Sequence, residues 1–177
     1  MSWSSRGGPS NAPAAFIQPC LPSVAQRPPR GPGWAHELKH DGYRLQIHVR
    51  DGRVRLYTMN DADWSKRYPL IIKDASKING TVVIDAEVVW LDSDGVPNFD
   101  ALHSRVNDDR ATALAFDLLM LGGEDLRRKP YVERKVALRK LLRGVAAFST
   151  SNMPKATVIS CSRQLARLDW KGSFQKN

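Results

Sequence analysis

The eight residues from Glu37 to Arg44, Glu-Leu-Lys-His-Asp-Gly-Tyr-Arg, hold the densest set of groups capable of chemistry. An amine is a nucleophile only when it is deprotonated, and nearby cations or desolvation lower its pKa. Lys39 has charged neighbours of both signs within a few residues, and Gly42 permits a close approach of the backbone to another element. Lys39 is therefore a candidate nucleophile. The alternative is a solvated loop of mixed charge, which composition alone favours.

Three carboxylates lie inside apolar stretches of the chain. Asp85 and Glu87 are two residues apart, so both side chains point to one face of a strand, and Asp117 follows Phe116 in a second apolar stretch. A buried carboxylate is costly unless it is paired, hydrogen-bonded or bound to a metal. For any one of these acids alone, a structural pair with an arginine is the better interpretation. Three acids in neighbouring strands favour a polar cleft.

Two alternating segments on either side of Asp51-Gly52 predict a β-hairpin. In residues 45–50 and 53–56, apolar side chains alternate with polar ones, which is typical of half-buried strands. Asp-Gly favours a two-residue turn. Such a turn pairs residue 50 with residue 53, and four apolar side chains then share one face: Ile47, Val49, Val54 and Leu56.

Further strands and helices follow the hairpin. Pro69 is suited to open a short helix, and Asn98 is suited to cap another. Residues 81–91 are rich in β-branched side chains and predict a long, mostly buried strand. Residues 113–121 predict a second buried strand, which ends at Gly122-Gly123.

A last helix is predicted over residues 132–143, with Gly144 as its stop. The predicted apolar stripe of this helix consists of Val132, Val136, Leu138, Leu141 and Leu142. No element is predicted for residues 145–177, where no hydrophobic period is visible. We therefore divide the chain into a tail of residues 1–30, a domain of residues 31–144 and a divergent tail of residues 145–177.

The composition is that of a basic chain of 177 residues, enough for one domain with tails. Lysine and arginine outnumber acids 27 to 18, and this net charge of +9 favours a polyanionic partner such as nucleic acid. The simpler alternative is a basic protein without such a partner. Seven of the eleven prolines fall within residues 1–32, which predicts disorder for most of that segment and an extended lead-in at residues 16–22.

Cysteine usage and hydropathy exclude several classes of protein. The two cysteines, Cys20 and Cys161, are far apart and form no CxxC motif, which argues against a zinc site or a disulfide framework. No apolar stretch approaches the length of a membrane span, and the N-terminus lacks the apolar core of a secretory signal. We therefore expect a cytoplasmic protein.

The segment Lys39-His40-Asp41-Gly42-Tyr43-Arg44 resembles the KxDGxR motif of the covalent nucleotidyltransferases, which include ATP-dependent DNA ligases, RNA ligases and mRNA capping enzymes. The flanking sequence is similar to that of bacterial DNA ligases of the end-joining type, so RNA ligase or capping activity is the weaker alternative. Four further stretches resemble that group in order and spacing, over roughly residues 16–143. They are Gly33-Trp34, residues 58–69 (family pattern SRNGxxWTxRFP), residues 84–89 (the DGE strand) and residues 116–119 with 125–134 (the FDLL strand and the segment after it).

This resemblance implies an α+β fold of antiparallel sheets flanked by helices, the ATP-grasp-like adenylation fold, here incomplete. In the family, the lysine attacks the α-phosphate of ATP, and the AMP then passes to a 5′-phosphate at a DNA nick. The resemblance assigns the nucleophile to Lys39 and a place beside the adenine amino group to Glu37. It assigns a contact with ribose or the nick-end phosphate to Arg44, ribose or metal binding to Glu87, and adenine stacking to Phe116. ATP, Mg²⁺ and nicked duplex DNA are the implied cofactors and partner.

The sequence also departs from the family pattern. Met59 stands in place of the arginine of SRNG, Ala86 in place of the glycine of DGE, and His103 where many relatives carry glutamine. The later lysine motifs, EGxVxK and KxK, are not found in residues 145–177, and an OB-fold domain would be expected to follow them. We therefore expect weak or absent ligation by this chain alone, because charge on the α-phosphate would be poorly stabilised.

Three interpretations remain open at this point. The first is a DNA ligase adenylation domain with partial activity. The second is a non-catalytic nucleotide- or DNA-binding remnant of a ligase, and the third is an unstable remnant with uncovered apolar faces. Only the first requires the amine of Lys39.

Overall fold

The predicted hairpin is present in the computed structural model, which describes residues 16–21, 27, 31 and 34–150. Strands β1 (Tyr43–Arg50) and β2 (Arg53–Thr58) pair antiparallel, with Val49 opposite Val54 and Ile47 opposite Leu56. Asp51 and Gly52 both take positive φ angles, 47° and 78°, as a two-residue turn that matches the strand twist requires. The predicted register is confirmed.

The described residues belong to two units. Residues 16–21 and 39–150 form one, and residues 27, 31 and 34–38 belong to the other. All of the described helices and strands lie in the first unit.

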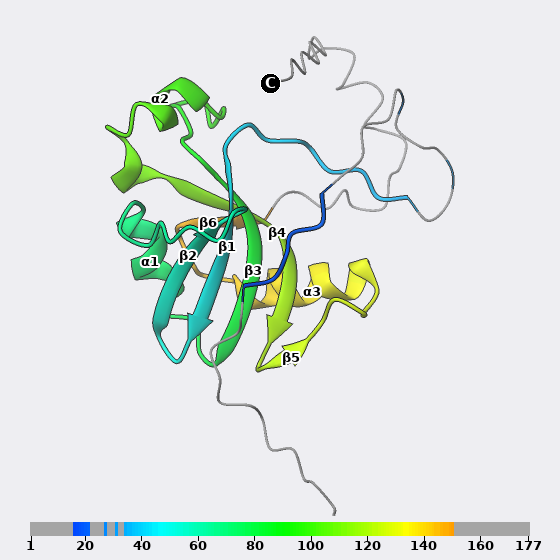
Figure 1. Cartoon of the computed structure of the whole chain (residues 1–177). Coiled ribbons are helices and arrows are strands. Elements are labelled where there is room, and N and C mark those ends of the chain that lie inside the picture. The colour runs from blue at the N-terminus through cyan, green and yellow to red at the C-terminus, as the bar shows by residue number, and fades with distance from the viewer. Residues whose placement is uncertain (1–15, 22–26, 28–30, 32–33, 151–177) are drawn as a thin grey trace, which may run out of the picture. The chain divides into compact units, whose positions relative to one another are not determined.

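The hairpin is part of a six-stranded sheet (Figure 1). Five of its strands follow the order β2-β1-β3-β4-β5, and the sixth, β6, pairs with β4 outside this order. Strands β3 (Thr81–Val89), β4 (Thr112–Leu121) and β5 (Glu124–Asp125) continue the antiparallel pairing. The short strand β6 (Phe148–Thr150) pairs with β4 in parallel, so the sheet is mixed rather than wholly antiparallel. The α+β class is confirmed, and β6 lies in the segment for which the sequence predicts no element.

Helices cover one face of the sheet and build the core with it. They are α1 (Pro69–Ala75), α2 (Phe99–His103) and α3 (Tyr131–Leu141), with a 3₁₀ turn at Asp108–Arg110. Pro69 opens α1 and Asn98 caps α2 through a hydrogen bond from Ala101 N–H, as predicted. Each helix contributes to a continuous cluster with the inward side chains of β1, β3 and β4. None of the helices in the described residues is long and apolar enough to cross a membrane.

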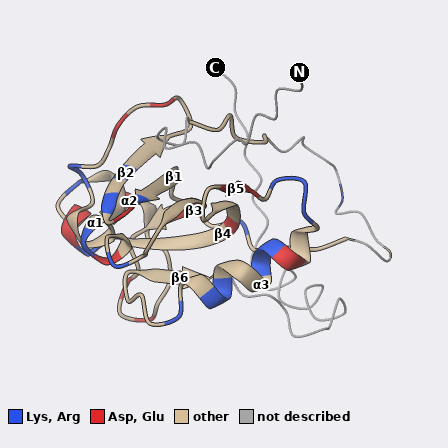
Figure 2. Cartoon of the chain, turned by 90° about the horizontal axis from the view of Figure 1, so that it is seen from below, with Lys and Arg blue, Asp and Glu red and all other residues tan. Residues whose placement is uncertain are grey.

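The predicted apolar stripe of α3 is wrong for two of its members. Val132 and Val136 are 56% and 58% exposed, whereas Leu138 and Leu142 are buried and Lys135 is only 2% exposed. The buried residues follow the helical spacing 135, 138 and 142, and the two valines lie on another face. Lys135 places its long aliphatic stem among them, with its amine 5.5 Å from the centre of the Tyr131 ring. Basic residues recur along α3 (Figure 2).

Strand β6 is held by a buried aspartate of α1. The Asp74 carboxylate accepts a hydrogen bond of 2.8 Å from the backbone N–H of Ala147, and Lys77 contacts its other oxygen. Asp74 is 4% exposed, and Ala147 and Phe148 are buried in the core. A three-residue strand has no visible period, which is why the sequence alone does not predict it.

The loop before β1 approaches β3 closely at Gly42. A Cβ atom on Gly42 would lie 2.2 Å from the carbonyl oxygen of Val88 and 3.1 Å from Cγ of Glu87. No side chain fits this space, so glycine is required here by the approach of two backbones. The glycine thus fixes the loop that carries Lys39 against the middle strand of the sheet.

Replacement of Asp74 by asparagine should lower stability at neutral pH by about 1–2 kcal/mol, because the charged acceptor of Ala147 and the partner of Lys77 are lost. Lys77 and the Ala147 N–H lower the pKa of Asp74 in the folded state. The stabilisation is therefore present above the ordinary aspartate pKa of about 3.9 and is lost as pH falls below it. Urea unfolding at pH 7 and pH 3 measures both effects. The difference between wild type and variant should shrink in acid, and Asp94→Asn, at an exposed turn, should change neither value.

Gly42→Ala should destabilise the fold by about 3 kcal/mol, because the methyl group overlaps the Val88 carbonyl. Gly80→Ala is the matched control, since Gly80 has a φ of +79° but no atom within 4 Å of the added Cβ. The control should cost only about 1 kcal/mol, the price of the left-handed conformation. Urea midpoints compare the two variants, and equal losses would contradict the close approach at Gly42.

Candidate active site

The face of the sheet opposite the core carries three polar side chains that the sequence singles out, Arg44, Asp85 and Glu87, together with others that it does not. Strand β1 contributes Arg44, Gln46 and His48, and β3 contributes Asp85 and Glu87. These positions alternate with the buried core residues of the same strands. We call this surface the polar face.

A β-bulge adds Phe116 to the polar face. Asp85 pairs with Asp117 and Ala86 pairs with Ala115, so Phe116 is an extra residue of β4. The extra residue interrupts the alternation, and the guanidinium of Arg44 lies over the Phe116 ring, 5.3 Å from its centre. Strand alternation alone could not predict this neighbour of Arg44.

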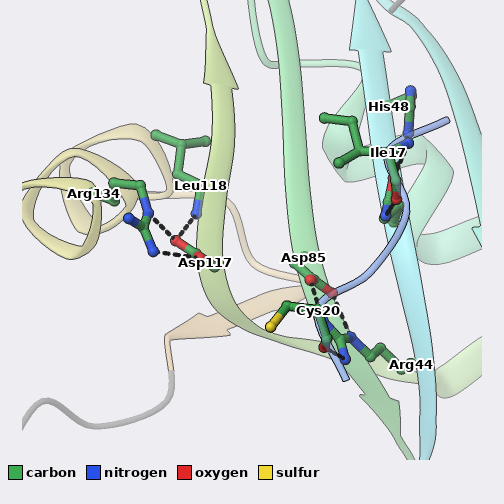
Figure 3. Close-up of polar contacts among 9 residues, drawn as sticks. Ile17, Cys20, Arg44, His48, Asp85, Asp117, Leu118 and Arg134 are labelled. Atoms are coloured by element: carbon green, nitrogen blue, oxygen red, sulfur yellow. Dashed lines mark hydrogen bonds and ion pairs between the residues drawn. The ribbon is translucent and has the colours of Figure 1, made fainter. Parts of the chain in front are cut away.

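Arg44 and Asp85 form a two-point ion pair at the centre of the polar face (Figure 3). Nε and Nη2 of Arg44 donate to the two carboxylate oxygens over 3.0 and 2.7 Å. Asp85 is 3% exposed, and the hydrogen bond to its carboxylate raises the pKa of Arg44. Burial raises the pKa of Asp85, and Arg44 opposes this shift, so the pair compensates an otherwise costly buried charge.

The third nitrogen of Arg44 is also occupied. Nη1 donates over 2.9 Å to the backbone carbonyl of Cys20, which lies in the segment Phe16–Leu21. Asp85 accepts from two nitrogens of Arg44, and the Phe116 ring lies against one face of its guanidinium plane. These hydrogen bonds and the one to Cys20 use three of the five guanidinium N–H groups, and the expected contact with ribose or the nick-end phosphate remains a prediction.

Glu87 is the carboxylate of the polar face that stands next to the Lys39 loop. Burial raises the pKa of Glu87 to about 7, while Lys39, Arg44 and the backbone N–H of Gly42 lower it and Asp41 raises it further. A carboxyl with such a pKa changes its charge near neutral pH. The structure thus brings Lys39, Arg44 and Glu87 into one electrostatic neighbourhood.

Lys39 is accessible to a ligand. Its side chain is 72% exposed, and Nζ lies 3.8 Å from a carboxylate oxygen of Asp41, itself 80% exposed. A surface pair of this kind is weak, so it holds the amine only loosely. Glu37 is exposed and belongs to the other unit, and its predicted place beside adenine remains a prediction.

Two of the three acids, Asp85 and Asp117, form the structural pair with an arginine that the sequence favours for a single acid. Asp117 accepts hydrogen bonds of 2.8 and 2.9 Å from Arg134 of α3, and it also caps the N–H of Leu118 (Figure 3). Asp85 is paired with Arg44 as described above. Within the described residues, Glu87 is the acid of the three whose carboxylate forms no salt bridge with an arginine.

The departures from the family pattern are accommodated in different ways. Ala86 is fully buried on the core face, where a small side chain fits between strands. His103 forms a 2.8 Å hydrogen bond through Nδ1 with the hydroxyl of Tyr43. Met59 is 44% exposed, and nothing in the structure explains its presence in place of arginine.

Arg67, from the stretch that resembles SRNGxxWTxRFP, fixes Tyr43 at the start of β1. Its guanidinium lies 4.8 Å from the centre of the Tyr43 ring and 4.5 Å from that of Trp64. Nε donates to Asp108 over 2.9 Å, and the side chain is only 10% exposed. Beside it is a surface hollow lined by Arg55, Asp63, Trp64, Ser65, Lys66, Arg67 and Arg105. Tyr43 directly follows Gly42, so this cluster supports the Lys39 loop from the core side.

Sequence reasoning predicted an extended lead-in at residues 16–22 but missed Gln46, the residue of the polar face that binds it. Gln46 is 2% exposed and binds the backbone of Ile17 at both its N–H and its carbonyl. A buried amide in an alternating strand was the available signal, but its partner lies 29 residues away in the chain.

Comparison with known proteins identifies the family of this chain. The model of the ATP dependent DNA ligase domain matches residues 23–168. The matched range continues beyond the last motif recognised in the sequence, and it includes the polar face and strand β6.

Two relatives in curated collections are multifunctional non-homologous end joining proteins. LigD of Pseudomonas aeruginosa is 41% identical over 142 residues, which cover 78% of this chain and 17% of that protein. LigD of Mycobacterium tuberculosis is 37% identical over 150 residues, which cover 81% of this chain and 19% of that protein.

Solved structures show the same relationship. The ligase domain of M. tuberculosis LigD has a TM-score of 0.59 at 34% identity, covering 66% of this chain and 38% of that one. A mycobacterial DNA ligase D complexed with ATP and MES has a TM-score of 0.60 at 33% identity, covering 74% of this chain and 44% of that one. The chain therefore spans less than half the length of each of these relatives. Its fold, its motifs and the extent of the match together show that it belongs to the family of ATP-dependent DNA ligase domains.

Proposed function

We propose that the chain performs the adenylation step of an ATP-dependent DNA ligase, with Lys39 as the nucleophile. The observation that carries the proposal is the close approach at Gly42, which fixes the Lys39 loop beside Glu87 on the polar face. A solvated loop of mixed charge would need no such approach. In this proposal, ATP is the substrate of the accessible Lys39 amine and binds at the polar face.

The reaction follows from these positions. Nζ of Lys39, once deprotonated, attacks the α-phosphorus of ATP, a P–N bond forms, and the bond to the pyrophosphate oxygen breaks. The proton of the amine leaves to solvent, because the Lys39 side chain is exposed. In the full reaction the AMP then passes to a 5′-phosphate at a nick, and the 3′-hydroxyl of the other strand displaces it.

The other residues would bind and orient the nucleotide. Phe116 offers its ring to adenine on the polar face, and Glu37 is proposed to accept from the adenine amino group. For Arg44 we propose first a structural role, since it holds Phe116 and Asp85 together. A contact of Arg44 with ribose or the nick-end phosphate would use one of the two guanidinium N–H groups that Asp85 and Cys20 leave over.

The carboxylate of Glu87 fits a Mg²⁺ ion that arrives with the nucleotide. Mg²⁺ is usually held by one or two carboxylates together with substrate phosphates and water. Within the described residues no group of three or more His, Cys, Asp or Glu side chains gathers as a metal site. When bound, the ion would neutralise charge on the phosphates; Glu87 itself would serve as an oxygen ligand or accept from the ribose hydroxyl.

Nicked duplex DNA is the proposed partner, and a cytoplasmic location is part of the same proposal. The net charge of +9 supports a polyanionic partner, and the relatives are named for DNA end joining and ligation. Nick sealing by this chain alone is expected to be weak, because EGxVxK and KxK motifs are not found in its sequence.

Lys39→Ala should abolish covalent labelling by ATP that carries a radioactive α-phosphate, because the variant has no amine to form the P–N bond. The measurement is label retained by the protein after denaturation, with Mg²⁺ present. Lys140→Ala, at an exposed position on α3, is the matched control and should label like wild type. A folded wild-type protein that acquires no label would favour the non-catalytic nucleotide- or DNA-binding alternative.

The apparent KM for ATP in the labelling reaction should fall as pH rises from 6 to 8, because Glu87, with a pKa of about 7, gains the charge that binds the ion or ribose. Glu87→Gln should have a KM about tenfold higher at pH 8 and a weaker dependence on pH. Glu133→Gln, an exposed acid on α3, is the control.

Unfolding measurements test the same pKa without nucleotide. The folded-state pKa of Glu87 lies above the ordinary value of about 4.3, so ionisation destabilises the fold as pH rises between these values. Glu87→Gln should therefore gain stability relative to wild type from pH 4 to pH 8. A constant difference would contradict the raised pKa.

A further inference from the structure

The segment Phe16–Leu21 is fastened to the polar face by the side-chain amide of Gln46. The Ile17 N–H donates to Oε1 of Gln46 over 3.2 Å, and Nε2 of Gln46 donates back to the Ile17 carbonyl (Figure 3). A side-chain amide has the donor and acceptor of a peptide group, so it can pair with an extended backbone that crosses a strand face. Gln46 thus replaces the missing ladder partner of residue 17.

The amide itself is held in one orientation. Nε2 of His48 lies 3.1 Å from Oε1 of Gln46, and the His48 ring packs edge-on against Tyr57 at 5.0 Å between ring centres. Phe16 contacts the same Tyr57 ring at 6.4 Å. Gln46 and His48 are 2% and 8% exposed, and a buried amide without partners would be costly. The attachment at Ile17 is therefore specific rather than a surface contact.

The other end of the segment reaches Arg44. The Cys20 carbonyl accepts from Nη1, the nitrogen of Arg44 that Asp85 does not use. An arginine side chain has several rotatable bonds, and each hydrogen bond to a fixed partner reduces the number of conformations that it can adopt. The segment consequently fixes the guanidinium plane, and that plane lies over the Phe116 ring.

We propose that residues 16–20 form a strap which Gln46 fastens, and that this strap positions Arg44 and Phe116 as one wall of the site for a purine nucleoside triphosphate. Gln46 is a positioning residue, because it acts through the strap and Arg44. The inference rests on the proposed function for its ligand. It goes beyond that function by assigning nucleotide affinity to a segment outside the recognised motifs.

The first test compares Gln46→Leu with Lys140→Leu in the full chain. Lys140 is exposed on α3, outside the strap and the polar face, so its replacement is the control for added apolar surface. Gln46→Leu should raise the apparent KM for ATP in Lys39 labelling about tenfold with a smaller change in the maximal rate, because orientation of the nucleotide is impaired. Lys140→Leu should leave both unchanged. An unchanged KM in folded Gln46→Leu, or a lower one, would overturn the strap as a wall of the site.

The second test uses Cys20 as a reporter and needs no catalysis. Its thiol is exposed and its carbonyl contacts Arg44, so a nucleotide in the proposed site should slow its alkylation by a maleimide. Mass spectrometry would follow modification of Cys20 separately from Cys161, with a non-hydrolysable ATP analogue as the probe. We expect at least severalfold protection in wild type and in Lys140→Leu, and little in Gln46→Leu.

The two readouts separate the strap from the proposed function. Protection of Cys20 without label on Lys39 would support the strap and overturn the proposed chemistry. Label on Lys39 without protection of Cys20 would support the chemistry and overturn the strap. Absence of both from a folded protein would overturn both. A chain from which residues 1–21 are deleted should bind ATP more weakly than wild type, and tighter binding would identify the segment as a plug instead.

Discussion

The ion pair between Arg44 and Asp85 is the interaction on which the polar face depends. A carboxylate that is 3% exposed in the middle strand would be costly without a partner, and Arg44 compensates it through two hydrogen bonds. Removal of either partner would leave an uncompensated charge, so the pair constrains both strands. The third nitrogen and the ring-facing plane of Arg44 extend this constraint to Cys20 and Phe116. One guanidinium therefore connects three separate parts of the chain.

Two backbone features place the reactive groups around this pair. The close approach at Gly42 fixes the Lys39 loop against β3, and the bulge of β4 turns Phe116 toward Arg44. Neither feature depends on a long side chain, so both are rigid supports for a site whose proposed nucleophile, Lys39, is exposed. Rigid support beneath an exposed lysine would suit the proposed reaction, in which the amine must reach a phosphorus atom and later release its adduct.

Local sequence patterns predicted most elements of the first unit. The elements that depend on contacts between residues far apart in the chain were not predicted. The hairpin register, the start of α1 and the cap of α2 follow from residues close together in sequence, and the structure confirms them. Strand β6 and the Gln46 strap depend on partners 73 and 29 residues away, which no local period records. The α3 stripe was wrong because Val132 and Val136 share a spacing with each other but not with the buried face. Residue types and spacing singled out Glu87 and Lys39, and the family resemblance gave their expected roles, while their proximity required the structure.

The pairing of the acids explains why a single carboxylate is left for ligand chemistry. Asp85 and Asp117 are each held by an arginine with two hydrogen bonds, and such charges serve the fold. Glu87 instead has a pKa near 7, a backbone N–H from Gly42 and two nearby cations, of which Lys39 is exposed. In the proposed reaction, adenylation would remove the charge of Lys39, because its amine would become a phosphoramidate. Loss of that cation would raise the pKa of Glu87 further and weaken its hold on a metal ion, which would favour release of the ion together with pyrophosphate. The placement of Lys39 beside Glu87 would thus help the products to leave.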